Sequence, residues 1–405
     1  MAKCLICENE YNPFIDFGKM PIANSFGSKE ELVDEYTFRM KVGFCNNCNM
    51  VQLVSQPNRE MMFHENYAFF SSTSNYMKDH FKNFSHSISN LQGLNENSFV
   101  VEIGCNDGIL LQNLVVDRIP CLGIEPSKNV AQVASDKGIK VITDFFDQSL
   151  AENILKTHKK ADAIISANVM CHIPYMHSIF EGIKILLSDD GVFVFEDPYL
   201  GEVIEKTSFD QIYDEHVFLF SALSVSYLAN MHELELINVE PQVTHGGSMR
   251  YTLAHKGIKN VSQNVKDLIL NEKNLGLDNE ELFLDYKNKV NKIRDDLIDL
   301  LSQLKNDGKK VVGYGATSKS TTVTNYFGIS QELVECIYDN TPIKQNKFSP
   351  GVHIPILPYD EFRKSDPDYV LLFAWNHAPE IMKKEKDYMR NDKHWITYIP
   401  EVNID

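Results

Sequence analysis

From residue 99 onward, short apolar runs alternate with amphipathic stretches of helical period. The apolar runs predict strands at 99–103, 121–124, 140–142, 161–166 and 191–195. The stretches between them predict helices at 108–117, 127–136, 147–157 and 175–187. Such alternation is typical of a parallel sheet covered by helices. Because ligands bind these sheets at the carboxyl ends of the strands, the residues after each strand are the first candidates for a site.

The first predicted strand runs into Val-Val-Glu-Ile-Gly-Cys-Asn-Asp-Gly at 100–108. Gly104 and Gly108 flank the turn into the next helix, where glycine lets the backbone come close to a ligand. The three-glycine fingerprint of pyrophosphate-binding turns is not met. Glu102 would sit badly beside a pyrophosphate, and it suits a ligand that carries an ammonium or sulfonium group.

Acidic and aromatic residues follow the next predicted strands. Glu125 ends the second strand, where a carboxylate can accept hydrogen bonds from both hydroxyls of a ribose. Asp144 and Phe145 follow the third strand, where they could accept from an adenine amine and stack on its ring. Asn168 and His172 follow the fourth strand. These residues predict a nucleoside site along one edge of the sheet.

Taken in order, these strand ends resemble the class I S-adenosylmethionine-dependent methyltransferases. The E-x-G-x-x-x-G pattern at 102–108 matches the first motif of that family, Glu125 its ribose-binding acid and Asp144 its adenine contact. The resemblance implies a cofactor site formed by Glu102, Gly104, Gly108, Glu125, Asp144, Phe145 and Asn168. The alternative is an unrelated doubly wound domain in which the two glycines are ordinary turn residues.

Two C-x-x-C pairs lie near the N-terminus, Cys4 with Cys7 and Cys45 with Cys48. Each pair can turn two thiolates toward one ion, and four thiolates suit tetrahedral Zn²⁺. Such a site leaves no open coordination position, so the metal would hold structure and do no chemistry. The alternative is two unligated pairs or a redox-active pair. The other cysteines are scattered and are expected to be ordinary reduced thiols.

The composition limits the possible functions. The 39 basic and 56 acidic residues give a formal net charge of −17, which argues against nucleic-acid binding as the main task. No apolar run reaches the roughly 18 residues of a membrane-spanning helix. The first residues also lack the pattern of a secretory signal, so we expect a cytoplasmic protein without a membrane partner.

A cluster of proton-handling side chains follows the fifth predicted strand. Tyr213, Glu215 and His216 lie close together in the sequence, near the predicted ligand edge. A histidine can remove a proton and later return it, Glu215 could orient it, and Tyr213 could donate to a developing oxyanion. The spacing alone leaves a simpler interpretation open, in which the histidine is bonded to the backbone at a helix start.

A second series of strands and helices follows a highly charged helical segment at 257–307. Its strands are predicted at 311–315, 334–338, 369–373 and 395–399. The first ends in Gly-Tyr-Gly-Ala-Thr-Ser-Lys, and the helix start at Lys319 could receive a phosphate through backbone N–H groups. Asp339 stands where ribose-binding acids stand, and Lys347 is a further candidate for a diphosphate. The alternative is a dinucleotide-binding fold that no longer binds a ligand and serves packing only.

Segments spread over nearly the whole chain resemble the sugar C-methyltransferases of deoxysugar pathways. These are the two C-x-x-C pairs and the sequences at 67–74, 100–108, 212–216, 245–250, 313–319 and 373–376. The family methylates C3 of a nucleotide-linked 4-keto-6-deoxysugar. Its catalytic histidine falls on His216, and its supporting tyrosine and glutamate fall on Tyr213 and Glu215. Phe69 departs from the family, which commonly has a tyrosine there, so substrate preference can differ.

The resemblance implies a three-domain α/β protein. It consists of a zinc-binding domain at 1–65, a Rossmann-like methyltransferase domain at 66–240 and a second Rossmann-like domain at 241–405 that binds the nucleotide sugar. The implied cofactors are S-adenosylmethionine and structural Zn²⁺. The expected substrate contacts are Tyr67, Ser71, Ser72, His172, His245, Arg250, Tyr314, Lys319, Asp339 and Lys347.

The implied reaction starts from the C3 hydrogen, which the neighbouring ketone at C4 makes acidic. His216 would remove this proton, Tyr213 would stabilise the enolate oxygen, and C3 would then attack the sulfonium methyl group in line. Two other functions stay open at this stage. One is methyl transfer to an oxygen or nitrogen of a nucleotide sugar, and the other is a zinc-bearing binding module without activity.

Overall fold

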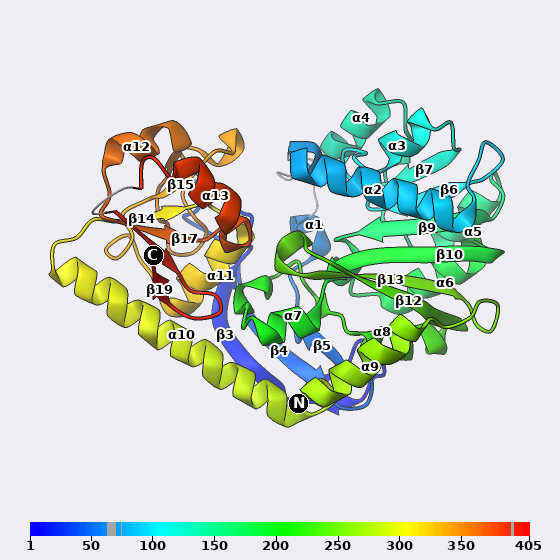
Figure 1. Cartoon of the computed structure of the whole chain (residues 1–405), viewed down its shortest axis with the longest axis horizontal. Coiled ribbons are helices and arrows are strands. Elements are labelled where there is room, and N and C mark those ends of the chain that lie inside the picture. Colours follow the sequence, from blue (N-terminus) through cyan, green and yellow to red (C-terminus); the bar gives the residue numbers. More distant parts are fainter. Residues whose placement is uncertain (63–69, 74, 390–392) are drawn as a thin grey trace.

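The computed structural model describes residues 1–62, 70–73, 75–389 and 393–405. Figure 1 shows two helix-covered sheets side by side, with the N-terminal strands below and between them. Tyr67, which was predicted to contact the substrate, and Phe69 lie outside the described residues. Among the helices that are described, none has the length and apolar character needed to cross a membrane.

The N-terminal part forms an antiparallel sheet in the order β11-β5-β4-β3. Its strands are β3 (Pro13–Pro21), β4 (Thr37–Cys45), β5 (Met50–Leu53) and β11 (Phe218–Leu219). A small hairpin of β1 (Ala2–Lys3) and β2 (Glu10–Tyr11) precedes them, and α1 (Arg59–Met62) follows β5. Strand β11 comes directly after His216 in the chain and pairs with β5. The segment that carries the predicted catalytic histidine therefore completes the N-terminal sheet.

The middle sheet has the order β12-β13-β10-β9-β6-β7-β8. Its strands are β6 (Val100–Ile103), β7 (Cys121–Ile124), β8 (Lys140–Ile142), β9 (Ala161–Ala167), β10 (Leu187–Pro198), β12 (Leu234–Gln242) and β13 (Ser248–His255). The five strands from β10 to β8 are parallel, and β13 is antiparallel to both of its neighbours. Every residue of β6 is buried, as expected for a central parallel strand with both faces covered.

Helices cover both faces of the middle sheet (Figure 1). They are α2 (Asn75–Gln92), α3 (Leu111–Val116), α4 (Lys128–Asp136), α5 (Gln148–Leu155), α6 (Met176–Leu186) and α8 (Ala222–Met231). Helix α7 (Leu200–Glu205) instead packs into the apolar core that the N-terminal and C-terminal sheets share. The predicted α/β class with a Rossmann-like, largely parallel sheet is thus confirmed. The predicted domain boundary at 240 falls within β12, which forms a hairpin with β13 inside this sheet.

The C-terminal sheet has the order β16-β15-β14-β17-β18-β19, in which only β19 is antiparallel. The strands are β14 (Val311–Tyr314), β15 (Ile337–Asp339), β16 (Ile356–Pro358), β17 (Tyr369–Leu372), β18 (His394–Thr397) and β19 (Asn403–Ile404). Its helices are α11 (Ser318–Phe327), α12 (Phe362–Ser365) and α13 (Ala378–Glu385). A capping box of Thr317 and Ser320 starts α11, and Gly328 ends it in the left-handed conformation.

Two helices connect the sheets. Helix α9 (Gln263–Leu275) is followed by the long α10 (Glu280–Asn306), whose buried side chains recur at helical spacing. Phe283 near its start stacks on Phe44 of β4, with ring centroids 4.4 Å apart, and lies 5.1 Å from the ring of Phe14. Farther along, α10 shares one apolar core with the C-terminal sheet. This helix therefore ties the N-terminal sheet to the C-terminal one, as Figure 1 shows along its lower edge.

Candidate active site

The predicted zinc ligands come together. The sulfur atoms of the four cysteines in the two C-x-x-C pairs lie within 4.8 Å of one another, and the Sγ atoms of Cys7 and Cys45 are 3.4 Å apart. Gln52 donates to Cys4 Sγ at 3.0 Å, and the Ile6 amide donates to the same sulfur at 3.4 Å. Hydrogen bonds from Cys45 and Cys48 hold the pKa of Cys4 well below its usual range. A thiolate cluster with N–H donors around it fits Zn²⁺.

A chain of hydrogen bonds fixes the zinc-binding turn to the middle sheet. His177 on α6 donates from Nε2 to the Ile6 carbonyl at 2.8 Å, and its Nδ1 lies 2.9 Å from His232 Nε2. The other nitrogen of His232 contacts Glu181 at 2.8 Å. The sequence analysis did not single out these residues, because the partners are far apart in the chain. The contacts show how a structural metal is linked to the methyltransferase sheet.

The carboxyl edge of the middle sheet holds two buried carboxylates. Glu125 accepts from the Asn106 amide at 3.0 Å and from the Ser127 amide at 2.9 Å. Glu102 is only 3% exposed, and its Oε2 has no hydrogen-bond partner within the described part of the chain. Burial, together with the charges of Glu125 and Asp107, raises the pKa of Glu102 well above its usual range. A buried oxygen without a partner suits a ligand that donates to it, so these residues fit the nucleoside cofactor.

The two glycines of the first turn are required by the chain itself. Gly104 has φ +72° and Gly108 has φ +77°. A Cβ atom at Gly104 would lie 2.4 Å from a methyl carbon of Val169, and one at Gly108 would lie 2.3 Å from Ile139 Cδ1. The sequence analysis explained these glycines by close approach to a ligand. The structure adds a different reason, which is the left-handed backbone and tight packing on neighbouring side chains.

The predicted adenine contacts have a neighbour that the sequence analysis missed. Asp144 is exposed and accepts from the Phe145 amide at 2.8 Å. The Arg59 guanidinium lies 4.1 Å from the centre of the Phe145 ring and 5.0 Å from that of Tyr175. Asn168 has φ +57°, and its Oδ1 is buried without a partner among the described residues. Arg59 comes from the N-terminal part of the chain, so no local pattern reveals its place over this ring.

Ser71 and Ser72, predicted to contact the substrate, are bonded to the turn after β6. The Ser71 amide donates to Asn106 Oδ1 at 3.0 Å. The Ser72 amide and hydroxyl donate to the Asp107 carboxylate at 3.0 and 2.9 Å. Lys137 donates to Ser72 Oγ at 3.0 Å. The serine pair therefore adjoins the predicted cofactor edge, and its contact with substrate stays a prediction.

His216 lies in a buried pocket of hydrogen-bonding partners. Its Nδ1 is 2.6 Å from the Gln211 carbonyl oxygen, and its Nε2 is 2.7 Å from the Tyr213 hydroxyl oxygen. A carbonyl can only accept, so Nδ1 carries the proton and Nε2 keeps its lone pair toward the Tyr213 hydroxyl. Burial holds the pKa of His216 well below its usual value. The bond to the backbone that the simpler interpretation expected is present, and it orients a neutral imidazole that can act as a base.

Two more imidazoles approach this histidine. The His172 ring lies 5.3 Å from the His216 ring at an interplanar angle of 22°. Burial lowers the pKa of His172 to about 3, and burial with the nearby Lys319 charge lowers the pKa of His245 to about 4. His245 has φ +54°, and its carbonyl accepts from the Gln211 side chain. The structure thus brings His172 and His245 near the predicted catalytic residue.

The segment before His216 is held by the N-terminal and C-terminal parts of the chain. Asp214 accepts from the Ala23 amide at 2.9 Å, and Glu215 accepts from the Asn24 side chain at 2.7 Å. Asn24 also accepts from the Ser318 hydroxyl at 2.9 Å, at the start of α11. All three parts of the chain therefore meet at the predicted catalytic segment, and Glu215 is anchored through Asn24.

Two lysines approach the site from the C-terminal sheet. Lys319 is 8% exposed, donates to Asn376 Oδ1 at 3.2 Å and lies 5.0 Å from the centre of the Trp375 ring. Burial lowers the pKa of Lys319 to about 8. Lys344 donates to the Ala316 carbonyl at 2.8 Å, and burial lowers its pKa as well. The sequence-based prediction named Lys347, and not Lys344, although both lie in the same short loop. Contact of either lysine with substrate stays a prediction.

Three predicted substrate residues have partners inside the protein. Arg250 donates to Glu196 through Nε and Nη2 at 3.2 and 2.9 Å. Its guanidinium also lies 3.8 Å from the centre of the Phe84 ring. The Tyr314 hydroxyl donates to Glu385 at 3.4 Å, and Asp339 accepts from the Ala316 and Thr341 amides, both at 2.7 Å. These contacts give each residue a structural role, and their contact with substrate stays a prediction.

Comparisons with known proteins cover most of the chain. Residues 4–63 match a family described as "Putative zinc binding domain", residues 76–239 match "Methyltransferase domain", and residues 243–400 match "C-methyltransferase C-terminal domain". The C-methyltransferase NovU of Streptomyces niveus is 29% identical to the chain, over 99% of this chain and 96% of its own length.

Solved methyltransferase structures overlap the chain in part. An S-adenosylmethionine-dependent methyltransferase from Anabaena variabilis is 14% identical, covers 43% of this chain and 84% of its own, and has a TM-score of 0.35. The magnesium protoporphyrin IX methyltransferase of Synechocystis, with bound S-adenosylhomocysteine, is 13% identical, covers 44% and 83% respectively, and has a TM-score of 0.35.

Proposed function

We propose that the chain is an S-adenosylmethionine-dependent C-methyltransferase with an N-terminal zinc-binding domain, and that it methylates C3 of a nucleotide-linked 4-keto-6-deoxysugar. The observation that supports this substrate class is the buried neutral imidazole of His216, oriented by the Gln211 carbonyl at 2.6 Å. A carbon acceptor must lose a proton to become nucleophilic, whereas an oxygen or nitrogen acceptor already carries a lone pair. Transfer to carbon therefore has the greater need of such a base.

The residues of the predicted cofactor site would bind the cofactor and orient it. Bound S-adenosylmethionine supplies an electrophilic methyl group on a positively charged sulfur. Glu102 would accept from a donor group of the cofactor through its unpartnered Oε2, and Glu125 would receive the ribose hydroxyls while it keeps the turn after β6 in place. The stacking surface for the adenine would be Phe145, with Arg59 beside it. These contacts would hold the cofactor along the edge of the middle sheet.

His216 and Tyr213 would share the proton chemistry. The Tyr213 hydroxyl now donates to His216 Nε2 at 2.7 Å, the atom that must take the C3 proton. When the sugar enters, this hydroxyl would turn to the C4 oxygen and leave Nε2 to the C3 hydrogen. The enolate charge would then form on an oxygen with a donor beside it, and the Lys319 charge, which acts on His216, would favour it. A positioned general base typically contributes about 10²–10⁴ in rate.

The nucleotide would bind along the carboxyl edge of the C-terminal sheet. Lys319, at the start of α11, and Lys344 supply two largely buried ammonium groups there. Both donate to oxygen atoms of the chain, Asn376 Oδ1 and the Ala316 carbonyl, and an ammonium can donate three hydrogen bonds. Charges of this kind suit a diphosphate, which would direct the attached sugar toward His216.

The proposal is tested with a panel of 4-ketosugar nucleotides in heavy water. Without methyl donor, the enzyme should place deuterium at C3 of its substrate, and with S-adenosylmethionine the product should carry a new methyl group at C3 by NMR. A methyl group on oxygen or nitrogen would refute the proposed acceptor. Turnover at C3 without exchange in the absence of methyl donor would refute a freely formed enolate.

A further inference from the structure

A second group of metal-ligating side chains lies at the catalytic histidine. One ligand atom each from Cys171, His172 and His216 can be chosen so that all three lie within 4.8 Å of one another. Cys171 and His172 belong to the short helix η2 (Met170–His172) at the end of β9, and His216 precedes β11. Nothing in the proposed reaction uses the Cys171 thiol. A Cys-His-His set is a common donor set for Zn²⁺ and related cations.

The surroundings of these side chains resemble those of metal ligands. A histidine that binds a metal usually donates its other ring nitrogen to a carbonyl or carboxylate, as His216 does to the Gln211 carbonyl. Below the thiol, the Asp197 carboxylate accepts from the Cys171 amide at 3.2 Å. The Oδ1 of Asp197 is buried and has no hydrogen-bond partner within the described ranges. The Asp197 carboxyl group therefore holds the Cys171 backbone in place beside the two histidines.

We propose that Cys171, His172 and His216 bind one divalent cation of the zinc type, separate from the four-cysteine site, and that this cation inhibits the enzyme. The Cys171 S–H bond breaks, a sulfur–metal bond forms, and the proton is released to water. No electrons are transferred. Inhibition rests on the proposed function, because the metal takes the His216 Nε2 lone pair that would accept the C3 proton. Metal binding itself does not depend on that function.

A cavity reaches one ligand of the cluster. It has a volume of about 210 Å³ and is lined by His172 together with Arg59, Met62, Tyr175 and Val217, among others. Water from this cavity, or the Tyr213 oxygen now 2.7 Å from His216 Nε2, could complete a tetrahedron around the metal.

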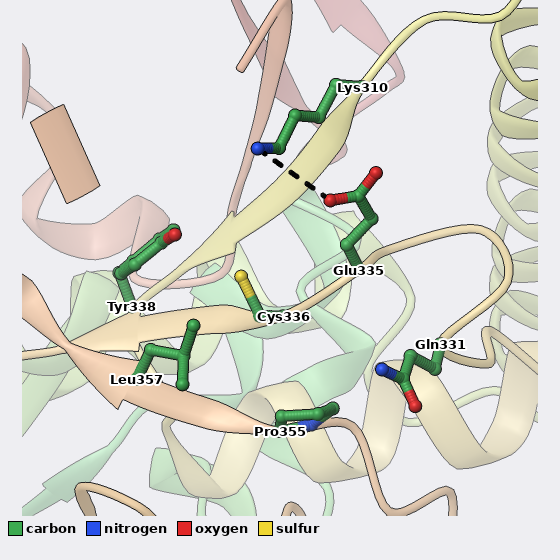
Figure 2. Close-up of a pocket in the computed structure, with 7 residues that line it drawn as sticks. All are labelled: Lys310, Gln331, Glu335, Cys336, Tyr338, Pro355 and Leu357. Atoms are coloured by element: carbon green, nitrogen blue, oxygen red, sulfur yellow. Dashed lines mark ion pairs between the residues drawn. The ribbon is translucent and has the colours of Figure 1, made fainter. Parts of the chain in front are cut away.

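Cys336 offers a matched control. It is buried like Cys171, but it lies in the C-terminal sheet beside a cavity of about 390 Å³ (Figure 2). Lys310, Glu335 and Tyr338 are among the residues that line this cavity, and none of its described lining residues is a histidine. Cys336 belongs to neither group of potential metal ligands in the described part of the chain. Replacing it removes a buried thiol without touching the catalytic cluster.

The test uses the full-length protein with its four-cysteine site filled and free metal removed by dialysis. Excess Zn²⁺ is added, and bound zinc per chain is counted by mass spectrometry of the dialysed complex and by calorimetry. Wild type and Cys336→Ala should take up a second equivalent and lose turnover. Cys171→Ala should bind one equivalent only, and its turnover should not fall when zinc is added. Loss of a ligand should weaken binding by more than the roughly 10–100-fold that loss of an outer-shell partner costs.

Each outcome decides the proposal. A second equivalent that persists in Cys171→Ala would place the metal elsewhere and overturn it, and so would the absence of a second equivalent in wild type. A second equivalent that depends on Cys171 but leaves turnover unchanged would overturn the inhibitory role. Should no 4-ketosugar nucleotide be turned over, the zinc count still tests the metal site, and the proposed function fails separately.

Discussion

In both parallel sheets, a carboxylate that accepts hydrogen bonds from backbone amides holds the turn after the first strand. In the middle sheet, Glu125 after β7 accepts from the Asn106 amide in the turn after β6 and from the Ser127 amide, at 3.0 and 2.9 Å. In the C-terminal sheet, Asp339 at the end of β15 accepts from the Ala316 amide in the loop after β14 and from the Thr341 amide, both at 2.7 Å. A carboxylate after the second strand therefore stabilises the loop of the first in both.

The sheets differ at the third residue of their first strand. In β6 this residue is Glu102, with a buried oxygen that has no hydrogen-bond partner among the described residues. In β14 it is Gly313, where a Cβ atom would lie 2.7 Å from the Phe373 ring. The third position of the first strand is therefore packed tightly in the C-terminal sheet, whereas in the middle sheet it supplies a buried oxygen that a ligand can bind. The acidic residue that both sheets share after the second strand does not by itself make their two edges alike.

The largest expected effect is on the proposed chemical step and not on either parallel sheet. His216→Asn should lower C-methylation by about 10²–10⁴, because the general base is lost. The asparagine amide can still donate to the Gln211 carbonyl, so the segment should stay folded. Turnover and deuterium exchange at C3 are measured together with S-adenosylhomocysteine affinity as the control. Turnover within about threefold of wild type would point to an oxygen or nitrogen acceptor instead.

A matched pair of substitutions tests the difference between the sheets directly. Glu102→Gln should weaken S-adenosylhomocysteine binding by about 10–100-fold, the cost of a charge-assisted hydrogen bond, without loss of stability. Gly313→Ala should leave that affinity unchanged and lower the free energy of unfolding by about 1–3 kcal/mol, because the methyl group overpacks against Phe373. Calorimetry and urea unfolding measure both. Weaker cofactor binding in Gly313→Ala would assign a cofactor role to the C-terminal sheet.

Stability should fall in acid because imidazoles are buried in the neutral form between the sheets. The pKa values of His172 and His245 lie at about 3 and 4 in the folded protein, below 6.5 in the unfolded chain. The unfolded chain therefore binds more protons as pH falls. The contribution of these neutral histidines to the free energy of unfolding is complete above about pH 6.5 and is lost below it. We expect the free energy of unfolding to fall by up to about 1 kcal/mol per histidine between pH 7.5 and 5.5, as measured by urea unfolding. A His245→Gln variant with an unchanged slope would contradict this assignment.

The smallest expected effect concerns the nucleotide at the C-terminal edge. Lys344→Ala should raise the KM of the nucleotide sugar about fivefold, as expected for one partly screened contact with a phosphate. Lys347→Ala in the same loop should change it less than about twofold. Steady-state kinetics on both variants decides which lysine serves the substrate. The reverse order would support the sequence-based prediction of Lys347.

Much of the framework was predictable from local patterns. The strands at 121–124 and 140–142 have the predicted bounds, and the buried stripe of α10 follows the predicted helical period. Periodicity works best where a strand is buried throughout, as β6 is, and where a helix buries one face, as α10 does. The cysteine spacing also predicted the zinc cluster, because two thiols in a C-x-x-C turn already face the same way.

The predicted site was less complete, because its residues meet across long distances in the chain. Arg59 lies over Phe145, and Asn24 links Glu215 to Ser318, yet none of these pairs shares a local pattern. Arg250 was predicted at the substrate because it lies in the 245–250 segment that resembles the sugar C-methyltransferases. In the structure its guanidinium is bonded to the buried Glu196, a partner that only the register of β10 against β13 brings opposite it.

The amino-acid sequence by itself predicted the two sheets and the four-thiolate cluster, because these follow from strand and helix periodicity and from the spacing within each C-x-x-C turn. The roles of Tyr213, Glu215 and His216 come from the family resemblance and stay predictions. Only the tertiary structure decided which nitrogen of His216 is available and that β11 joins the N-terminal sheet to the catalytic segment. It also decided that Glu102 has a buried oxygen without a hydrogen-bond partner among the described residues, and that Phe373 packs against Gly313. These properties depend on close packing between distant segments, and close packing is set by shape in three dimensions.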